Sequence, residues 1–132
     1  MGAWGRGSFE NDSALDWLEN AFKPGGAAAV EAALRYAAEG PEDAYLDVDE
    51  ASAVVAAAEF VAAARDGDVS RLGVAGNYLA AHRSALASPH LVPVARQALD
   101  RVLRKSELRD LWTEGPDQGW LNEMNSLSAR LR

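Results

Sequence analysis

Residues 47–66, which read DVDEASAVVAAAEFVAAARD, predict the fold more clearly than any other part of the chain. Asp47 and Glu50 stand three residues apart, as in a capping box at the start of a helix. Apolar residues then recur every three or four positions, which is the spacing of one face of an α-helix. They are Ala51, Val54, Val55, Ala58, Val61 and Ala62. Asp66-Gly67-Asp68 ends the helix that this pattern predicts.

The residues before this helix predict two shorter ones. Asn11 or Asp12 is a suitable N-cap for a first helix, because short polar side chains accept hydrogen bonds from free backbone N–H groups. We expect that helix to stop before Pro24-Gly25-Gly26, since proline and glycine are strong helix breakers. A second helix is predicted over about Ala27 to Glu39, and Gly40-Pro41 ends it.

The residues after the central helix predict the rest of the bundle. A fourth helix is expected over about Val74 to Ala87. Ser88-Pro89 is expected to cap and open a fifth, because proline is preorganised for the first helical position. A short segment from Ser106 to Trp112 has its own Ser106 cap, and a last helix spans about Gln118 to Leu131. The fourth helix is predicted to bury Tyr78, Leu79 and Leu86.

The whole chain is therefore predicted to be helical. No alternation of apolar and polar residues typical of a strand lasts beyond a few positions, and no linker is long enough to divide the chain. We expect an all-α fold, a compact single-domain bundle of about six or seven short helices over residues 1–132. A chain of this length buries enough surface to be stable without a disulfide or a metal.

Composition indicates where such a protein works. The 132 residues include no cysteine, which excludes thiol chemistry and disulfides and fits a reducing compartment. The Met1-Gly2 start lacks the basic and apolar regions of a secretory signal, and no apolar run reaches about 18 residues. We expect a cytoplasmic protein that does not enter a membrane.

The charge of the chain is negative and unevenly spread. The net charge is −7, which makes polyanionic nucleic acid a poor partner. Residues 1–66 hold 13 acidic and 4 basic residues, whereas residues 67–132 hold 7 acidic and 9 basic ones. The acidic half is suited to a basic partner, and the alternative is an acidic surface that only faces water.

Sequence motifs for catalysis or for metal binding are missing. The three glycines of residues 2–7 lack the Gly-Lys-Ser/Thr ending of a phosphate loop. Residues 66–77 begin like a calcium loop, but Arg71 stands where glycine is needed and Asn77 stands where glutamate is needed. The two histidines do not have zinc-site spacing, and no serine lies in a Gly-x-Ser-x-Gly motif. We therefore expect no catalytic residue, no metal and no cofactor.

Residues 1–11 are unusual for a chain terminus because they combine large aromatic residues with glycines. Terminal segments are more often polar and frayed. We expect Trp4 and Phe9 to turn inward and to dock this segment on the helical core, with the glycines letting the backbone bend.

Carboxylates near two helix starts form the strongest candidate site. Asp12 and Asp16 are four residues apart and share a face of the first helix, beside Trp17, and three more acids lie within residues 47–50. If the two helix starts meet, three or more carboxylates could bind a hard cation or act as an acid/base pair. The alternative is that each carboxylate stabilises a helix N-terminus. The candidate binding residues are Trp4, Asp12, Asp16, Trp17, Asp47 and Asp49.

The start of the chain also resembles a known family. Residues 4–17 carry the pattern Trp-Gly-x-Gly-x-Phe-x-Asn-Asp-x-Ala-x-Asp-Trp, and residues 45–51 and 106–112 give two supporting matches. These stretches are similar to a family of uncharacterised bacterial proteins that carry a domain of unknown function. The resemblance implies a small, mostly helical bacterial protein, and it brings no reaction, cofactor or catalytic residue.

Three functions fit these observations. The first is a non-enzymatic binding protein of the bacterial cytoplasm, for example an immunity-like or antitoxin-like protein whose acidic half faces a basic partner. The second is a small-molecule or metal-dependent enzyme that uses the clustered carboxylates near the N-terminus. The third is a homodimer whose tryptophans fill the subunit interface.

Overall fold

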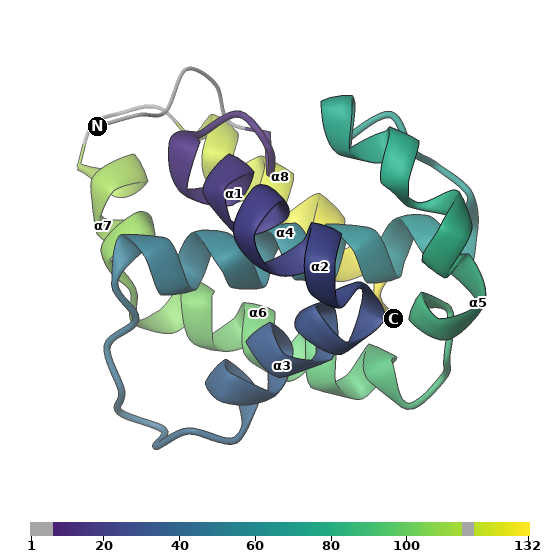
Figure 1. The fold of residues 1–132 in the computed structure, drawn as a ribbon. Helices are drawn as coiled ribbons and strands as arrows, with labels where there is room; N and C mark the ends of the chain where they lie inside the picture. The colour runs from purple at the N-terminus through teal and green to yellow at the C-terminus, as the bar shows by residue number, and fades with distance from the viewer. Residues whose placement is uncertain (1–6, 115–117) are drawn as a thin grey trace.

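Helix α4 (Val48–Asp66), which follows the capping box at residues 47–50, runs through the centre of the fold (Figure 1). From Ala51 to Ala64, each residue of α4 except Ala53 is buried, because other helices pack around it. The helix is thus buried all round, and the single apolar stripe predicted from its sequence is too narrow. A helix that is apolar on every side is typical of the centre of a helical protein.

The computed structural model describes residues 7–114 and 118–132 of the chain. Regular structure within these ranges is helical apart from isolated bridge positions such as the pair Leu46 and Ser106, which confirms the predicted all-α bundle. No helix in the same ranges is long and apolar enough to cross a membrane.

Both ends of α4 follow the sequence. The Asp47 side chain accepts a hydrogen bond from the Glu50 amide at 2.8 Å, and Glu50 Oε1 accepts one from the Asp47 amide at 2.9 Å. Gly67 ends the helix with φ of 78°, a left-handed conformation that favours glycine. The predicted capping box is therefore confirmed.

The first helix is longer than predicted. It consists of three consecutive segments, α1 (Asp12–Trp17), the π-helix η1 (Leu18–Phe22) and α2 (Lys23–Gly25). Asn11 is its N-cap, as predicted, and accepts a hydrogen bond from the Ala14 amide at 2.8 Å. The prediction that this helix stops before Pro24 is wrong.

The first helix continues through Pro24 because the π-helical turn η1 precedes this residue. The Lys23 amide bonds to the Leu18 carbonyl five residues earlier, and Pro24 then occupies the first turn of α2, where its missing N–H costs little. The helix ends at Gly26, whose φ is 61°. A Cβ at Gly26 would lie 2.6 Å from the His82 ring, so both backbone conformation and packing require glycine there.

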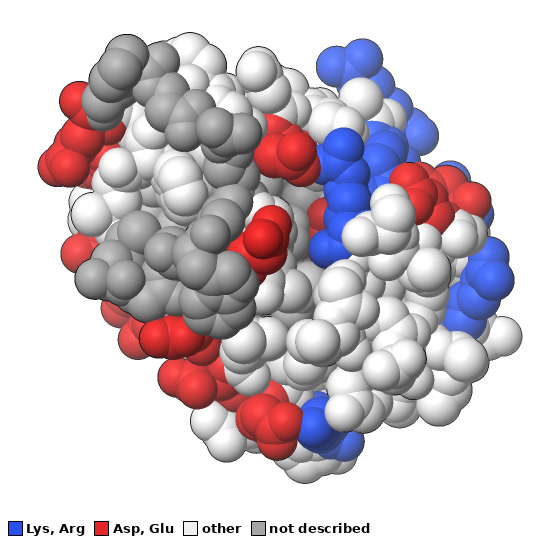
Figure 2. Space-filling view, turned by 90° about the horizontal axis from the view of Figure 1, so that it is seen from above, with Lys and Arg blue, Asp and Glu red and all other residues white. Residues whose placement is uncertain are grey.

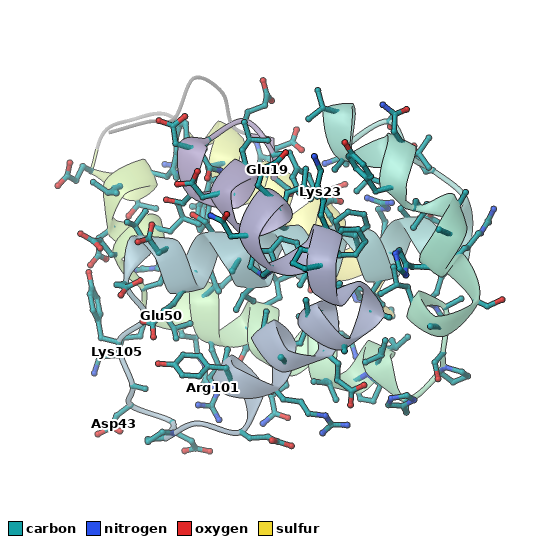
Figure 3. The ribbon with its side chains drawn as sticks, viewed as in Figure 1. Glu19, Lys23, Asp43, Glu50, Arg101 and Lys105 are labelled. Carbon is teal, nitrogen blue, oxygen red and sulfur yellow. The ribbon has the colours of Figure 1, made fainter. Side chains whose placement is uncertain are left out.

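Helices α3 (Ala27–Ala38) and α6 (Leu91–Arg104) pack against each other and against α4. Arg101 of α6 is buried, and its guanidinium donates hydrogen bonds to the Gly40 and Pro41 carbonyls at 3.0 and 2.8 Å (Figure 3). Because the last carbonyls of a helix have no intrahelical donor, Arg101 stabilises the chain where α3 ends.

Residues 73–86 depart most from the prediction of one α-helix. They form two 3-10 segments and one short α-helix, namely η2 (Gly73–Tyr78), η3 (Ala80–His82) and α5 (Arg83–Leu86). Gly73 and Gly76 lower the α-helical propensity of this stretch. Leu79 and Leu86 are buried as predicted, but Tyr78 is 37 % exposed. The Tyr78 ring is instead covered by Lys23, whose Nζ lies 4.8 Å from the ring centre.

Helix α6 begins at Leu91, two residues later than Ser88-Pro89 predicts. The Ser88 carbonyl accepts a hydrogen bond from the Leu91 amide at 3.1 Å, and Ser88 Oγ bonds to His90 Nδ1 at 2.7 Å. These bonds form a turn that precedes the helix, so the predicted helical start at Pro89 is wrong.

The last two helices agree with the sequence. Helix α7 (Glu107–Thr113) is capped by Ser106, whose side chain accepts a hydrogen bond from the Arg109 amide at 3.0 Å, as predicted. Helix α8 (Gly119–Arg130) packs against α4, α6 and α7. Tyr45, in the loop before α4, donates a hydrogen bond to Asp110 of α7 at 2.7 Å, and this bond raises the pKa of Tyr45 to about 12.

Aromatic rings join the start of the chain to α4. Phe60 of α4 stacks on Phe22 with a centroid separation of 4.3 Å and meets the edge of Phe9 at 5.5 Å. Trp17 lies beside both, at 5.9 Å from Phe22 and 6.2 Å from Phe60. Phe9 is buried, whereas Trp4, which was predicted to turn inward with it, lies outside the described residues.

Candidate functional site

An open groove with a volume of about 440 Å³ lies between the first helix, α3 and α4. In the view of Figure 1 the first helix lies in front of α4, and α3 lies below α4. The groove is lined by Trp17, Ala21, Ala29, Ala32, Ala33, Tyr36, Glu50 and Ala53. We call it the alanine groove. Its volume falls within the range of protein sites for small molecules or short segments.

Small side chains create the alanine groove. Ala29, Ala32 and Ala33 follow one side of α3, while Ala21 and Ala53 face them from η1 and α4. An alanine side chain has a single methyl group, so helices that meet at alanines leave space which longer side chains would fill. The floor of the groove is therefore apolar and shallow.

Two aromatic residues and one carboxylate border the alanine groove. Trp17 is held in place by its contacts with Phe22 and Phe60. Tyr36 is 62 % exposed and its hydroxyl donates a hydrogen bond to Glu50 Oε2. The groove thus combines an apolar floor with a fixed polar group at one end.

Glu50 is the charged group of this groove. Its pKa is lowered by the hydrogen bond from the Tyr36 hydroxyl and by that from the Asp47 amide, so the side chain is an anion at neutral pH. The bond to Glu50 raises the pKa of Tyr36, which therefore keeps its proton. Within the described ranges, the hydrogen-bond donors to Glu50 are this phenol and this amide, and neither carries a charge.

The structure brings several of the predicted site residues near one another. Asp49 accepts a hydrogen bond from Ser13 Oγ at 2.7 Å, so the starts of α1 and α4 do meet. Asp12 and Asp16 are exposed on α1, one turn apart. Of the remaining candidates, Trp17 lines the groove, Asp47 caps α4, and Trp4 lies outside the described residues.

These carboxylates do not form a metal-ligand cluster in the part of the chain that the structure describes. No group of three or more His, Asp or Glu side chains there is placed to hold an ion. Asp47 bonds to a helix amide, and Asp49 bonds to a serine hydroxyl. The capping alternative therefore describes Asp47, while the binding role of the other candidates stays a prediction.

The predicted binding residues included neither Glu50 nor the groove alanines, and sequence reasoning missed Tyr36 altogether. Tyr36 lies off the apolar face of α3, in a helix that is otherwise rich in alanine. An exposed aromatic in such a helix is the available signal, but its partner Glu50 is 14 residues away. The pairing depends on how α3 packs against α4, which helical periodicity does not predict.

A buried ion pair lies elsewhere in the fold. Glu59, in the middle of α4, accepts hydrogen bonds from Arg130 Nη1 at 2.7 Å and from Ser8 Oγ at 3.1 Å. Arg130 Nε also donates to Asp66 Oδ2 at 2.8 Å. Burial raises the pKa of Glu59, while Arg130 acts in the opposite direction. This network fastens the N-terminal segment and α8 to α4, and it faces the core, so its role is structural.

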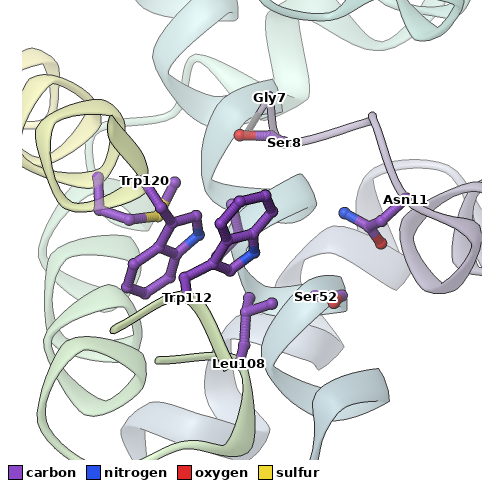
Figure 4. Close-up of a pocket in the computed structure, with 9 residues that line it drawn as sticks. Gly7, Ser8, Asn11, Ser52, Leu108, Trp112 and Trp120 are labelled. Atoms are coloured by element: carbon purple, nitrogen blue, oxygen red, sulfur yellow. The ribbon is translucent and has the colours of Figure 1, made fainter. Parts of the chain in front are cut away.

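A small cavity of about 10 Å³ lies near the tryptophans of α7 and α8 (Figure 4). Trp112 and Trp120 lie side by side there, with Ser52 and Asn11 across from them. Ser52 Oγ is buried without a hydrogen-bond partner within the described ranges. A volume of this size holds roughly one water molecule, so the cavity is too small for an organic ligand.

The capping role of Asp47 gives a direct prediction. Asp47→Ala is expected to lower the free energy of unfolding by about 1 kcal/mol, because the Glu50 amide loses its acceptor. Asp47→Asn keeps an acceptor and removes the charge, so its stability is expected to match the wild type. Urea unfolding followed by circular dichroism measures both variants. If Asp47→Asn lowers the free energy of unfolding as much as Asp47→Ala does, the negative charge of Asp47 stabilises the fold, and its capping hydrogen bond does not.

Comparison with known proteins gives one match. A family model described as "Domain of unknown function (DUF4259)" matches residues 2–123. No match was found among curated proteins or among solved structures.

Proposed function

The chain belongs to the DUF4259 family, whose members carry a domain of unknown function, so we propose a role from the structure. We propose that the protein is a non-enzymatic binding protein of the bacterial cytoplasm. In this proposal the alanine groove docks a segment of a basic partner protein. One form of this role is an immunity-like or antitoxin-like protein that neutralises its partner by covering it.

The groove and its acidic surroundings together carry the proposal. Apolar grooves between helices are typical docking sites for partner segments. Residues 1–66, which build the whole groove, hold 13 acidic and 4 basic residues. Figure 2 shows Asp and Glu side chains gathered along one side of the molecule, at the left and lower left of the view, whereas Lys and Arg lie mainly on the right. Such a field attracts a positively charged partner and speeds its association.

The protonation states of Glu50 and Tyr36 favour binding over catalysis. An effective general acid or base has a pKa near the working pH. Here the shared hydrogen bond lowers the pKa of Glu50 and raises that of Tyr36, so both pKa values move away from neutrality. The pair is suited to holding a fixed negative charge, which is what recognition of a cation needs.

A matched pair of alanine variants tests the proposal. Ala32 and Ala28 are both exposed on α3, but only Ala32 is among the residues that line the groove. Ala32→Phe fills the groove, and Ala28→Phe adds the same ring outside it. In quantitative affinity capture from the source bacterium, we expect a basic protein to bind the wild type and Ala28→Phe. Its recovery with Ala32→Phe is expected to fall about tenfold or more.

Two results would contradict this role. Equal recovery of the basic protein with both variants would place its docking site outside the groove. If the wild type sediments as a dimer and the Ala32→Phe variant sediments as a monomer, the groove is occupied by a second copy of the chain and not by a basic partner.

A further inference from the structure

We infer that the alanine groove recognises a lysine side chain of the partner, with its ammonium group at Glu50 and its methylene chain on the alanine floor between Trp17 and Tyr36. This inference rests on the proposed function and adds to it the chemistry of the docked residue. Lysine joins an apolar stem to a charged head, so it matches a groove that is apolar along its floor and anionic at one end.

Glu50 is the carboxylate among the residues that line the groove, and it differs from Glu19, Glu31 and Glu39 in having no basic partner within the described ranges. Glu19 is paired with Lys23 on the first helix, and both lie above Glu50 in the view of Figure 3. Glu31 of α3 and Glu39, the C-cap of that helix, are both paired with Arg35. Glu50 lies at the start of α4 and receives hydrogen bonds from neutral groups within the described ranges. It is therefore the groove carboxylate whose charge a partner would neutralise.

The hydrogen bonds already made by Glu50 leave acceptor positions for a cation. Oε1 accepts the Asp47 amide and Oε2 accepts the Tyr36 hydroxyl, so each oxygen has used part of its acceptor capacity. A carboxylate oxygen has about two acceptor positions, so one position stays free on each oxygen of Glu50. An ammonium is a compact charge and needs a free position on one oxygen only.

The same chemistry occurs within the described part of the chain, at Lys23. Lys23 pairs with Glu19 and also lies over the Tyr78 ring, with Nζ 4.8 Å from the ring centre. Its ammonium is thus held between a carboxylate and an aromatic ring. At the groove, Glu50 and Tyr36 offer this combination of groups to an incoming cation.

Nuclear magnetic resonance titration with single-residue probes tests the inference. N-acetyl-lysine-N-methylamide is added to ¹⁵N-labelled protein, and the indole N–H signal of Trp17, assigned with Trp17→Phe, reports on the groove. We expect the lysine probe to bind about tenfold more tightly than the norleucine analogue, which lacks the charge.

Substitution of the carboxylate completes the test. Glu50→Gln is expected to weaken the lysine probe about tenfold, and it can preserve the fold because glutamine also completes a capping box. Asp110→Asn is the control, since Asp110 accepts a tyrosine hydroxyl in the same way but lies outside the groove. Circular dichroism checks that both variants fold. Equal binding of lysine and norleucine probes, or unchanged binding by Glu50→Gln, would overturn the inference.

The two proposals fail in different ways. If Ala32→Phe abolishes partner capture while Glu50→Gln leaves it unchanged, the groove is the docking site but lysine is not what it recognises. If the lysine probe binds at Glu50 while Ala32→Phe leaves partner capture unchanged, the cation site exists and the proposed docking role is wrong.

Discussion

Replacement of Arg130 by methionine is expected to lower the free energy of unfolding by about 3–5 kcal/mol. Glu59 is 2 % exposed in the middle of α4, and Arg130 Nη1 contacts its Oε1 at 2.7 Å. Without Arg130, the carboxylate must remain charged in an apolar environment or take up a proton. Both alternatives cost free energy that the native ion pair avoids.

Urea unfolding followed by circular dichroism measures this loss, and the chain contains a suitable control. Arg104 forms an exposed ion pair with Asp100 one helical turn away. Arg104→Met should therefore cost less than about 1 kcal/mol. Addition of Glu59→Leu to Arg130→Met is expected to restore most of the stability, because the unpaired buried charge disappears. If the double variant is less stable than Arg130→Met alone, the ion pair is not the cause of the loss.

Truncation of Phe60 to alanine is expected to lower the free energy of unfolding of the otherwise wild-type protein by about 3–5 kcal/mol. Phe60 is fully buried and stacks on Phe22 with a centroid separation of 4.3 Å. It also contacts Phe9 and Trp17, so its removal leaves a cavity against which the N-terminal segment and the first helix both pack. Neighbouring helices can close such a cavity only in part.

The same urea experiment, with tryptophan fluorescence as a second probe, measures the effect of Phe60→Ala. Val74→Ala is the control, since Val74 is 63 % exposed and its truncation should change stability by less than about 0.5 kcal/mol. Phe60→Leu keeps most of the volume and should lie between the alanine variant and the wild type. An alanine variant as stable as Val74→Ala would mean that the aromatic contacts do not hold the core together.

Local signals predicted most of the helices. Asp47 and Glu50 cap α4, and Asn11 and Ser106 cap their helices, because a cap depends on residues within three or four positions. The predicted helix boundaries were wrong where other features of the fold outweighed the local preference of a residue. Pro24 did not end the first helix because a π-helical turn precedes it, and residues 73–86 did not form one α-helix because two glycines and the Lys23–Tyr78 contact favour a different path.

The candidate site was less predictable than the fold. Trp17, one of the predicted binding residues, lines the groove, and the hydrogen bond from Ser13 to Asp49 shows that the starts of α1 and α4 meet. The groove itself depends on how helices pack, because Tyr36 reaches Glu50 only when α3 crosses α4. A run of alanines predicts a helix well, but it does not predict which of their methyl groups will border an open space.

The position of Glu59 has a consequence for how this chain is made in the cell. The carboxylate lies near the middle of the sequence, while its partners Ser8 and Arg130 lie near the two ends. A chain emerging from the ribosome therefore produces α4 well before it produces Arg130, so during most of synthesis Glu59 lacks the guanidinium that binds it in the folded structure. We expect the domain to complete its folding only after its last helix has left the ribosome, as a single late event.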